Sequence, residues 1–104
     1  MQRKSLLLTA RSTLAKNLQL ARTIFGWSQE DLGLECGLKR TYIGALERGE
    51  ISLGIDNLER LAKGIGVPTY VLLLDSAEAY THLNRALEQR NDSLRRARVT
   101  RLSR

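Results

Sequence analysis

The sequence predicts an all-α protein with five core helices followed by an additional C-terminal helix. Apolar residues make up 42% of its 104 residues, and they recur at intervals of three and four, which is the spacing of one helix face. Residues that favour strands never alternate with polar ones over a useful length, and proline occurs once. Several of the apolar stripes also end at a glycine, the residue that most easily closes a helix.

The first helix is predicted to begin near Ser12 and to end before Gly26. Its apolar positions lie on one face, at Leu14, Leu18, Ala21 and Phe25. Residues 1–11 show no clear pattern and are assigned to an N-terminal extension.

The second and third predicted helices are short. Ser28 is a favourable N-cap because its hydroxyl can accept the free amide of Asp31, and acidic side chains stabilise the positive end of a helix. Gly37 ends this helix. The third helix is expected from near Lys39 to Arg48, before Gly49.

A loop leads to the fourth helix, which is expected to bury Ile55, Leu58, Leu61, Ala62 and Ile65 and to end at Gly66. Pro68 fits the first turn of a fifth helix, because a proline there removes no helical hydrogen bond. This fifth helix contains Val71, Leu72 and Leu74. The five helices form one domain over residues 12–75.

The remaining residues, 76–104, form a C-terminal helix and an arginine-rich tail. We expect a helix over 76–94 with a thin apolar stripe of Tyr80, Leu83, Leu87 and Leu94, and disorder or phosphate contact over 95–104. Three roles stay open for this end: a solvated tail, a phosphate-binding extension, or a helix that pairs subunits. Residues 85–104 contain seven arginines against two acidic residues, whereas residues 1–84 are nearly balanced. The net charge of +6 therefore says little about the central domain.

Composition argues against several classes of protein. The single cysteine, Cys36, cannot form an internal disulfide and fits a small core position. The single histidine, His82, is expected to be exposed, and no metal ligand or catalytic partner lies at a useful spacing from it. No apolar run approaches the ~20 residues of a membrane span, and Leu6–Leu8 is too short for a signal peptide. We expect a cytoplasmic protein that is not an enzyme and has no cofactor, no metal and no membrane partner.

Two short helices joined by a turn that contains glycine are typical of the DNA-binding helix-turn-helix unit. At about 100° per residue, Ile43 and Leu46 lie on the inner side of the third helix. The opposite side is predicted to expose Arg40, Thr41, Gly44, Ala45 and Arg48. Small residues at Gly44 and Ala45 are expected to let the backbone approach the groove floor, with the alanine methyl near a thymine methyl.

Several short stretches are informative when taken together: Gly26 to Leu32, Gly37, Tyr42-Ile43, Leu46–Gly49 and Leu61–Val67. Through them, about residues 12–75 resemble the phage-repressor-like (Cro and xenobiotic-response-element) helix-turn-helix family. The resemblance implies a sequence-specific regulator of transcription that binds double-stranded DNA as a homodimer at a palindromic operator, with residues 39–48 in the major groove. The segment 40–43 also resembles the small controller proteins of restriction–modification systems.

The resemblance also implies roles for single residues. Base edges would be contacted by Lys39, Arg40 and Thr41, and a phosphate by Gln29, with Tyr42 and Arg48 either further phosphate contacts or plain surface. Lys39 departs from the family, which has Ser or Thr as a cap there.

Two further sets are structural. Arg22 and Glu47 would form a buried ion pair, and the dimer surface would consist of Tyr70, Val71, Leu72 and Leu74. The alternative is a protein-interaction module of the same fold, an antitoxin or coactivator, with a partner protein. Arg40 and Gly44 on the exposed face favour DNA.

Overall fold

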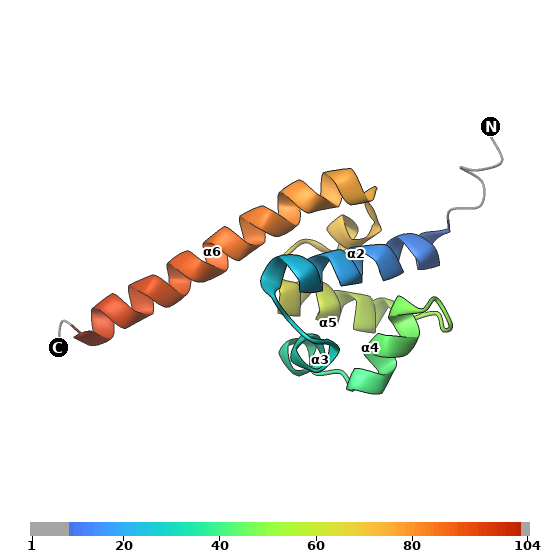
Figure 1. The fold of residues 1–104 in the computed structure, drawn as a ribbon, viewed down its shortest axis with the longest axis horizontal. Coiled ribbons are helices and arrows are strands. Elements are labelled where there is room, and N and C mark those ends of the chain that lie inside the picture. Colours follow the sequence, from blue (N-terminus) through green and yellow to red (C-terminus); the bar gives the residue numbers. More distant parts are fainter. Residues whose placement is uncertain (1–8, 103–104) are drawn as a thin grey trace.

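The computed structural model describes residues 9–102, which are helices and their connections (Figure 1). In chain order these elements are α2 (Ala10–Phe25), α3 (Gln29–Cys36), α4 (Arg40–Glu47), α5 (Ile55–Ile65), the 3₁₀ helix η1 (Thr69–Leu73) and α6 (Ser76–Leu102). The predicted all-α fold class is confirmed. None of the helices described is long and apolar enough to cross a membrane.

Side-chain and glycine caps set the ends of the first two helices. α2 begins at Ala10, earlier than predicted, because Thr9 and Ser12 form a capping box, and it ends at Gly26 with φ 70°. α3 begins after Ser28, whose hydroxyl accepts the Asp31 amide at 3.0 Å, and it ends before Gly37 with φ 71°. Both of these stops therefore use the left-handed conformation that glycine adopts at no steric cost.

The core lies between α2, α3, α4, α5, η1 and the first half of α6. Its largest fully buried apolar side chains are Leu14, Leu18, Leu32, Ile43, Leu46, Leu61, Ile65, Val71, Leu72 and Leu83. One predicted core position is wrong: Ile55 is 74% exposed. It is the first residue of α5, where the chain leaves an exposed loop, so the apolar face is covered only from Leu58 onward.

Two glycines allow α3 to approach its neighbours closely. A Cβ atom at Gly33 would collide with the backbone oxygen of Leu38, in the turn before α4. A Cβ at Gly64 of α5 would lie 2.8 Å from the Glu35 oxygen and 2.5 Å from the Cys36 sulfur of α3. Backbone atoms cannot move aside easily, so these glycines set the spacing of α3 against the two helices beside it.

The predicted fifth α-helix is instead the short 3₁₀ helix η1, and Leu74 lies just beyond its end. Val71 and Leu72 are fully buried. Asn17 of α2 fixes this region, because its Nδ2 donates to the backbone oxygens of Leu72 (2.9 Å) and Leu74 (2.8 Å). Competition by this buried amide for the carbonyl groups favours the tight 3₁₀ turn over a regular helix.

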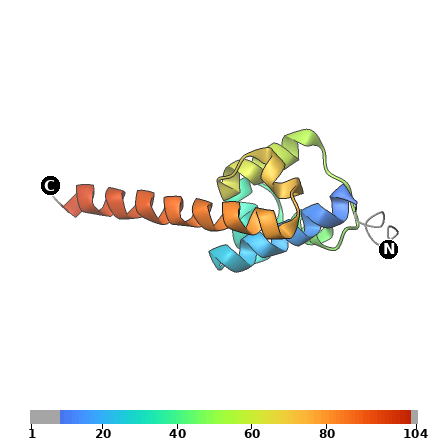
Figure 2. The same ribbon diagram turned by 90° about the horizontal axis from the view of Figure 1, so that it is seen from above.

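The C-terminal helix α6 is longer than predicted and continues through Leu102. Of the two alternatives for residues 95–104, disorder is therefore wrong as far as Leu102, and phosphate contact stays a prediction. Residues 103–104 lie outside the described residues. The first half packs on the body through Ala79, Leu83 and Ala86. The second half leaves the body and extends past it, as Figures 1 and 2 both show.

Candidate nucleic-acid interface

The start of α4 is exposed. Lys39, Arg40 and Thr41 all face solvent, and none of them has an ion pair or a side-chain hydrogen bond with any other residue that the structure describes. Lys39 is the N-cap residue, but its side chain makes no capping bond. The backbone amides of the first turn are thus left without a side-chain cap, and they lie beside two cationic side chains.

The other end of α4 is locked by an ion pair between Arg22 of α2 and Glu47. Arg22 Nε lies 2.7 Å from one carboxylate oxygen of Glu47, and Nη2 lies 2.8 Å from the other. The Glu47 side chain is 4% exposed and that of Arg22 is 23% exposed. The hydrogen bond to Glu47 raises the pKa of Arg22, although burial opposes this. Both bonds are charge-assisted and they fix the angle between the two helices.

Two glutamines complete the surroundings of Glu47. Gln29, the first residue of α3, donates from Nε2 to Glu47 Oε1 at 3.1 Å. Gln19 of α2 donates to the Glu47 backbone oxygen at 3.0 Å. Gln29 therefore spans from the start of α3 to the end of α4, and one amide hydrogen of its side chain is used within the protein.

Gly44 is not the exposed position that its place on the helix predicts. It is buried, and a Cβ added there would lie 3.1 Å from Arg48 Nη1 and 3.5 Å from Gln29 Oε1. The side chains of Gln29 and Arg48 cover it, so the glycine makes room for them and does not open the backbone to solvent. Ala45, next to it, is half-buried.

Tyr42 and Arg48 have partners that the sequence did not reveal. The Tyr42 hydroxyl accepts a hydrogen bond from Asn57 of α5 at 3.0 Å. Arg48 Nε lies 2.8 Å from Glu50 Oε2, and both side chains are more than half exposed. This contact lowers the pKa of Glu50. Arg48 and Glu50 are two residues apart and lie outside a regular helix, so no periodic pattern in the sequence indicates that they pair.

The residues predicted for a dimer surface divide into two kinds. Tyr70 is 58% exposed and packs edge-on against His82, with ring centroids 6.2 Å apart. His82 is half-buried, where the sequence predicted exposure. Val71 and Leu72 are fully buried within the chain, so their placement on an exposed dimer surface is wrong, and Leu74 is half-buried.

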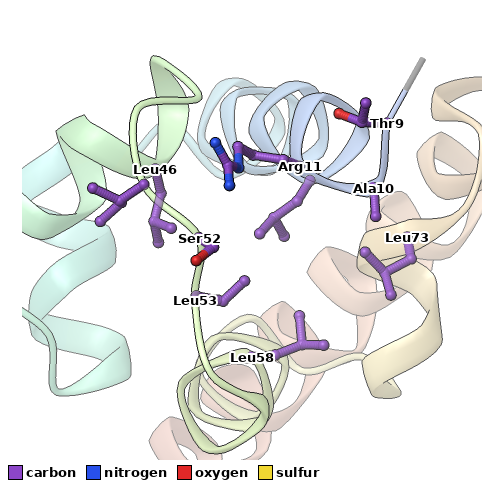
Figure 3. Close-up of a pocket in the computed structure, with 10 residues that line it drawn as sticks. Thr9, Ala10, Arg11, Leu46, Ser52, Leu53, Leu58 and Leu73 are labelled. Atoms are coloured by element: carbon purple, nitrogen blue, oxygen red, sulfur yellow. The ribbon is translucent and has the colours of Figure 1, made fainter. Parts of the chain in front are cut away.

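A cavity of about 500 Å³ lies on another part of the domain, between the start of α2, the segment 51–53 and η1 (Figure 3). Its lining is mainly aliphatic, with Leu14, Leu46, Leu53, Leu58 and Leu73 among its members, and the polar members are Thr9, Arg11 and Ser52. Elsewhere Cys36 is buried, and burial raises its pKa to about 11. In the described part of the chain, no group of histidine, cysteine and acidic residues could hold a metal ion.

Comparison with known proteins adds to this geometry. A helix-turn-helix family model matches residues 18–72. A hypothetical transcription factor from Neisseria meningitidis serogroup B is 46% identical over 68 residues, which are 65% of this chain and 64% of that protein. Control protein C.BamHI of Bacillus amyloliquefaciens is 48% identical over 46 residues, 44% of this chain and 57% of that protein. The matches thus span less than two thirds of either relative.

Two further comparisons agree. Control protein C.SmaI of Serratia marcescens is 40% identical over 63 residues, which are 61% of this chain and 75% of that protein. Among solved structures, the hypothetical transcription factor NHTF from Neisseria superposes with a TM-score of 0.64 at 44% identity, and the match covers 67% of this chain and 80% of that one.

Proposed function

This chain belongs to the helix-turn-helix family of DNA-binding transcription regulators, and on that premise we propose that it binds a palindromic operator in duplex DNA as a homodimer. One observation supports this most directly. α4 presents Arg40 and Thr41, exposed and unpaired within the described residues, at the end opposite to its fixed, ion-paired terminus. A helix held in this way can enter the major groove with its first turn leading.

In this proposal the first turn of α4 contacts bases. Arg40 donates two hydrogen bonds to O6 and N7 of a guanine, and Lys39 and Thr41 contact neighbouring base edges. Ala45 offers a methyl group for a thymine methyl, whereas the burial of Gly44 leaves it a spacing role. Specificity then depends mainly on Arg40, because a fork of two donors distinguishes guanine from the other bases.

Phosphate groups are bound beside this turn. Gln29 keeps one amide hydrogen beyond its bond to Glu47, and the free backbone amides at the start of α3 favour an anion. Tyr42 accepts from Asn57, so its own hydroxyl hydrogen is available for a phosphate oxygen. Arg48 would exchange Glu50 for a phosphate. These contacts orient α4 on the duplex without selecting a sequence.

The homodimer follows from the number of contacts. One α4 reaches only a few base pairs, whereas two copies related by a two-fold axis contact half-sites about 10 base pairs apart. Because Val71 and Leu72 are used within the chain, we place the dimer surface on exposed Tyr70 and Leu73 with Leu74 at its edge.

Selection of bound sequences from a random duplex pool tests this function. We expect one palindromic site, bound by two copies with nanomolar affinity at moderate salt and at least about 10³ times more tightly than random duplex. Titrations against the recovered site and a shuffled version of it give the ratio, and sedimentation gives the stoichiometry. Equal affinity for every duplex would contradict the proposal, and a protein that binds no DNA would favour a protein-interaction module of the same fold.

A further inference from the structure

We propose that the second half of α6, residues 91–102 (the distal arm), is a second DNA-binding element, which follows the phosphate backbone of the duplex flanking the operator. The proposal rests on the proposed function, because it assumes that α4 is bound to DNA nearby. It assigns a partner, duplex DNA, to a segment that does not take part in the core of the domain.

Between Asn91 and Val99 the distal arm adds no buried side chain to the core. It extends straight beyond the body in both ribbon views (Figures 1 and 2), and every side chain from Asn91 to Val99 is exposed. Its 12 residues span about 18 Å at 1.5 Å per residue, which corresponds to about five base-pair steps of a duplex. An isolated helix of this length is marginal in water, so the arm depends on the packed first half of α6 for its nucleation.

The charge of the distal arm identifies the chemistry of that partner. Arg95, Arg96 and Arg98 are all exposed, and the single acidic residue, Asp92, lies 3.6 Å from Arg95 at the surface. At about 100° per residue, the three arginines lie within about 160° of one another around the helix. Arg95 and Arg98 are also like charges three residues apart, which destabilises a free helix. A row of phosphates on that side would remove the repulsion.

A second copy of the chain fits the distal arm less well. The exposed apolar side chains, Leu94 (62%) and Val99 (59%), are five residues apart and point about 140° away from each other. They form no continuous stripe for helix pairing, and paired arms would bring like charges together. Charge complementarity therefore favours DNA over self-association.

The base of the distal arm is attached to the helix-turn-helix unit. Arg90 Nη2 lies 2.9 Å from Glu35 Oε1 of α3, and its guanidinium lies over the Trp27 ring, 5.1 Å from the centroid. The Arg90 side chain is 37% exposed, so water screens part of this attraction. Even so, two contacts to one guanidinium orient the helix here. The arm thus leaves the body beside α3, whose start is a proposed phosphate contact.

The test uses the full chain and a variant with Arg95→Gln, Arg96→Gln and Arg98→Gln. Glutamine has nearly the helix propensity of arginine, so the arm stays helical, which circular dichroism verifies. A control variant, Lys16→Gln, Arg60→Gln and Arg85→Gln, removes three exposed charges elsewhere. Each protein is titrated with the selected site in duplexes of about 20 and about 40 base pairs, at several salt concentrations.

We expect the unchanged chain and the control to bind the longer duplex about tenfold more tightly, and the arm variant to lose this gain. The slope of log affinity against log salt should become shallower by about 0.9 for each phosphate that the arm variant no longer binds, with the base preference unchanged.

Three results would overturn the proposal: an arm variant that keeps the full gain, equal losses in both variants, or an arm variant that becomes monomeric while the control variant stays dimeric. The last result would assign the arm to subunit pairing. If the unchanged chain shows no site preference, the proposed function fails, and the arm is then judged separately by the two variants on random duplex.

Discussion

The two ends of α4 differ in burial and in side-chain contacts. Its C-terminal end is buried, and Glu47 there receives hydrogen bonds from Arg22, Gln29 and Gln19. Its N-terminal end is exposed, and the side chains of Lys39 and Arg40 have no bonded partner among the described residues. The eight residues of α4 therefore join a structural site to a candidate binding site.

This difference shows how a short helix can be fixed in position at one end and still expose its other end to a ligand. A helix of eight residues is too short to be stable by itself, so tertiary contacts at one end must fix it. Once Glu47 is fixed on α2 and α3, the direction of α4 no longer depends on its first turn. The side chains of that turn are then free to be selected for contacts with a ligand.

The largest expected effect comes from breaking the fixed end. Arg22→Ala leaves the buried Glu47 carboxylate without its cation and should lower the free energy of unfolding by about 3 kcal/mol, the lower end for a buried pair, because Arg22 is partly exposed. Urea denaturation measures the decrease.

The matched control for this prediction is the double variant with Glu47→Gln. Because glutamine carries no charge to leave unpaired, the double variant should be destabilised by less than the sum of the two single changes. Strictly additive effects would mean that the two side chains do not interact in solution.

At the exposed end, Arg40→Ala should leave stability unchanged and affect binding alone. Removal of two hydrogen bonds to guanine should cost about 1–3 kcal/mol on the operator, with little effect on random duplex. Binding to the operator and to its single-base substitutions measures this, and the preference should relax at one symmetric pair of positions. If the complete base preference survives, Arg40 does not contact a base.

A smaller effect on stability is expected at Cys36, which is buried in α3. Its pKa is raised from the ordinary 9.0 to about 11, mainly by burial and further by Glu35. A folded-state pKa above the unfolded value favours folding below about pH 9, and this contribution disappears as the pH rises towards 11. Relative to Cys36→Ala, the unchanged chain should lose about 1 kcal/mol of stability between about pH 8 and about pH 10, measured by denaturation. Parallel pH profiles would contradict the burial of the thiol.

The smallest expected effect is at Arg48, just after the fixed end. Arg48 is already paired with Glu50 at the surface, so exchanging this partner for a phosphate gains little. Arg48→Ala should weaken binding to all duplexes about threefold and make the salt slope shallower by the equivalent of about one phosphate per copy. Titration against the operator and random duplex distinguishes this from a loss of specificity, which would place Arg48 on a base.

The sequence predicted those features of the fold that depend on neighbours in the chain. Ser28 and the glycines at positions 26, 37 and 66 marked helix ends because capping involves residues only a few positions apart. The 3₁₀ form of residues 69–73 could not be predicted in this way. It accompanies hydrogen bonds from Asn17, more than fifty residues earlier in the chain.

In the candidate site, helical periodicity correctly indicated that Arg40 and Thr41 would be exposed, and it failed at Gly44. Periodicity gives the direction of a side chain relative to its own helix axis. It does not show that Gln29 from α3 and the long side chain of Arg48 cover that position. The length of α6 was also missed, because its second half has no apolar stripe to extend the pattern.

Asn17 also has a consequence for hydrogen exchange. Besides its two donated bonds, its Oδ1 accepts from the Ser76 hydroxyl at 3.0 Å, so one buried amide holds both the end of η1 and the start of α6 on α2. Amides near residues 79–83 should therefore exchange only through openings that release α2 as well. Amides of the distal arm, which has no such attachment, should exchange through local fraying many times faster. Within the single helix α6, protection should fall steeply beyond Arg90.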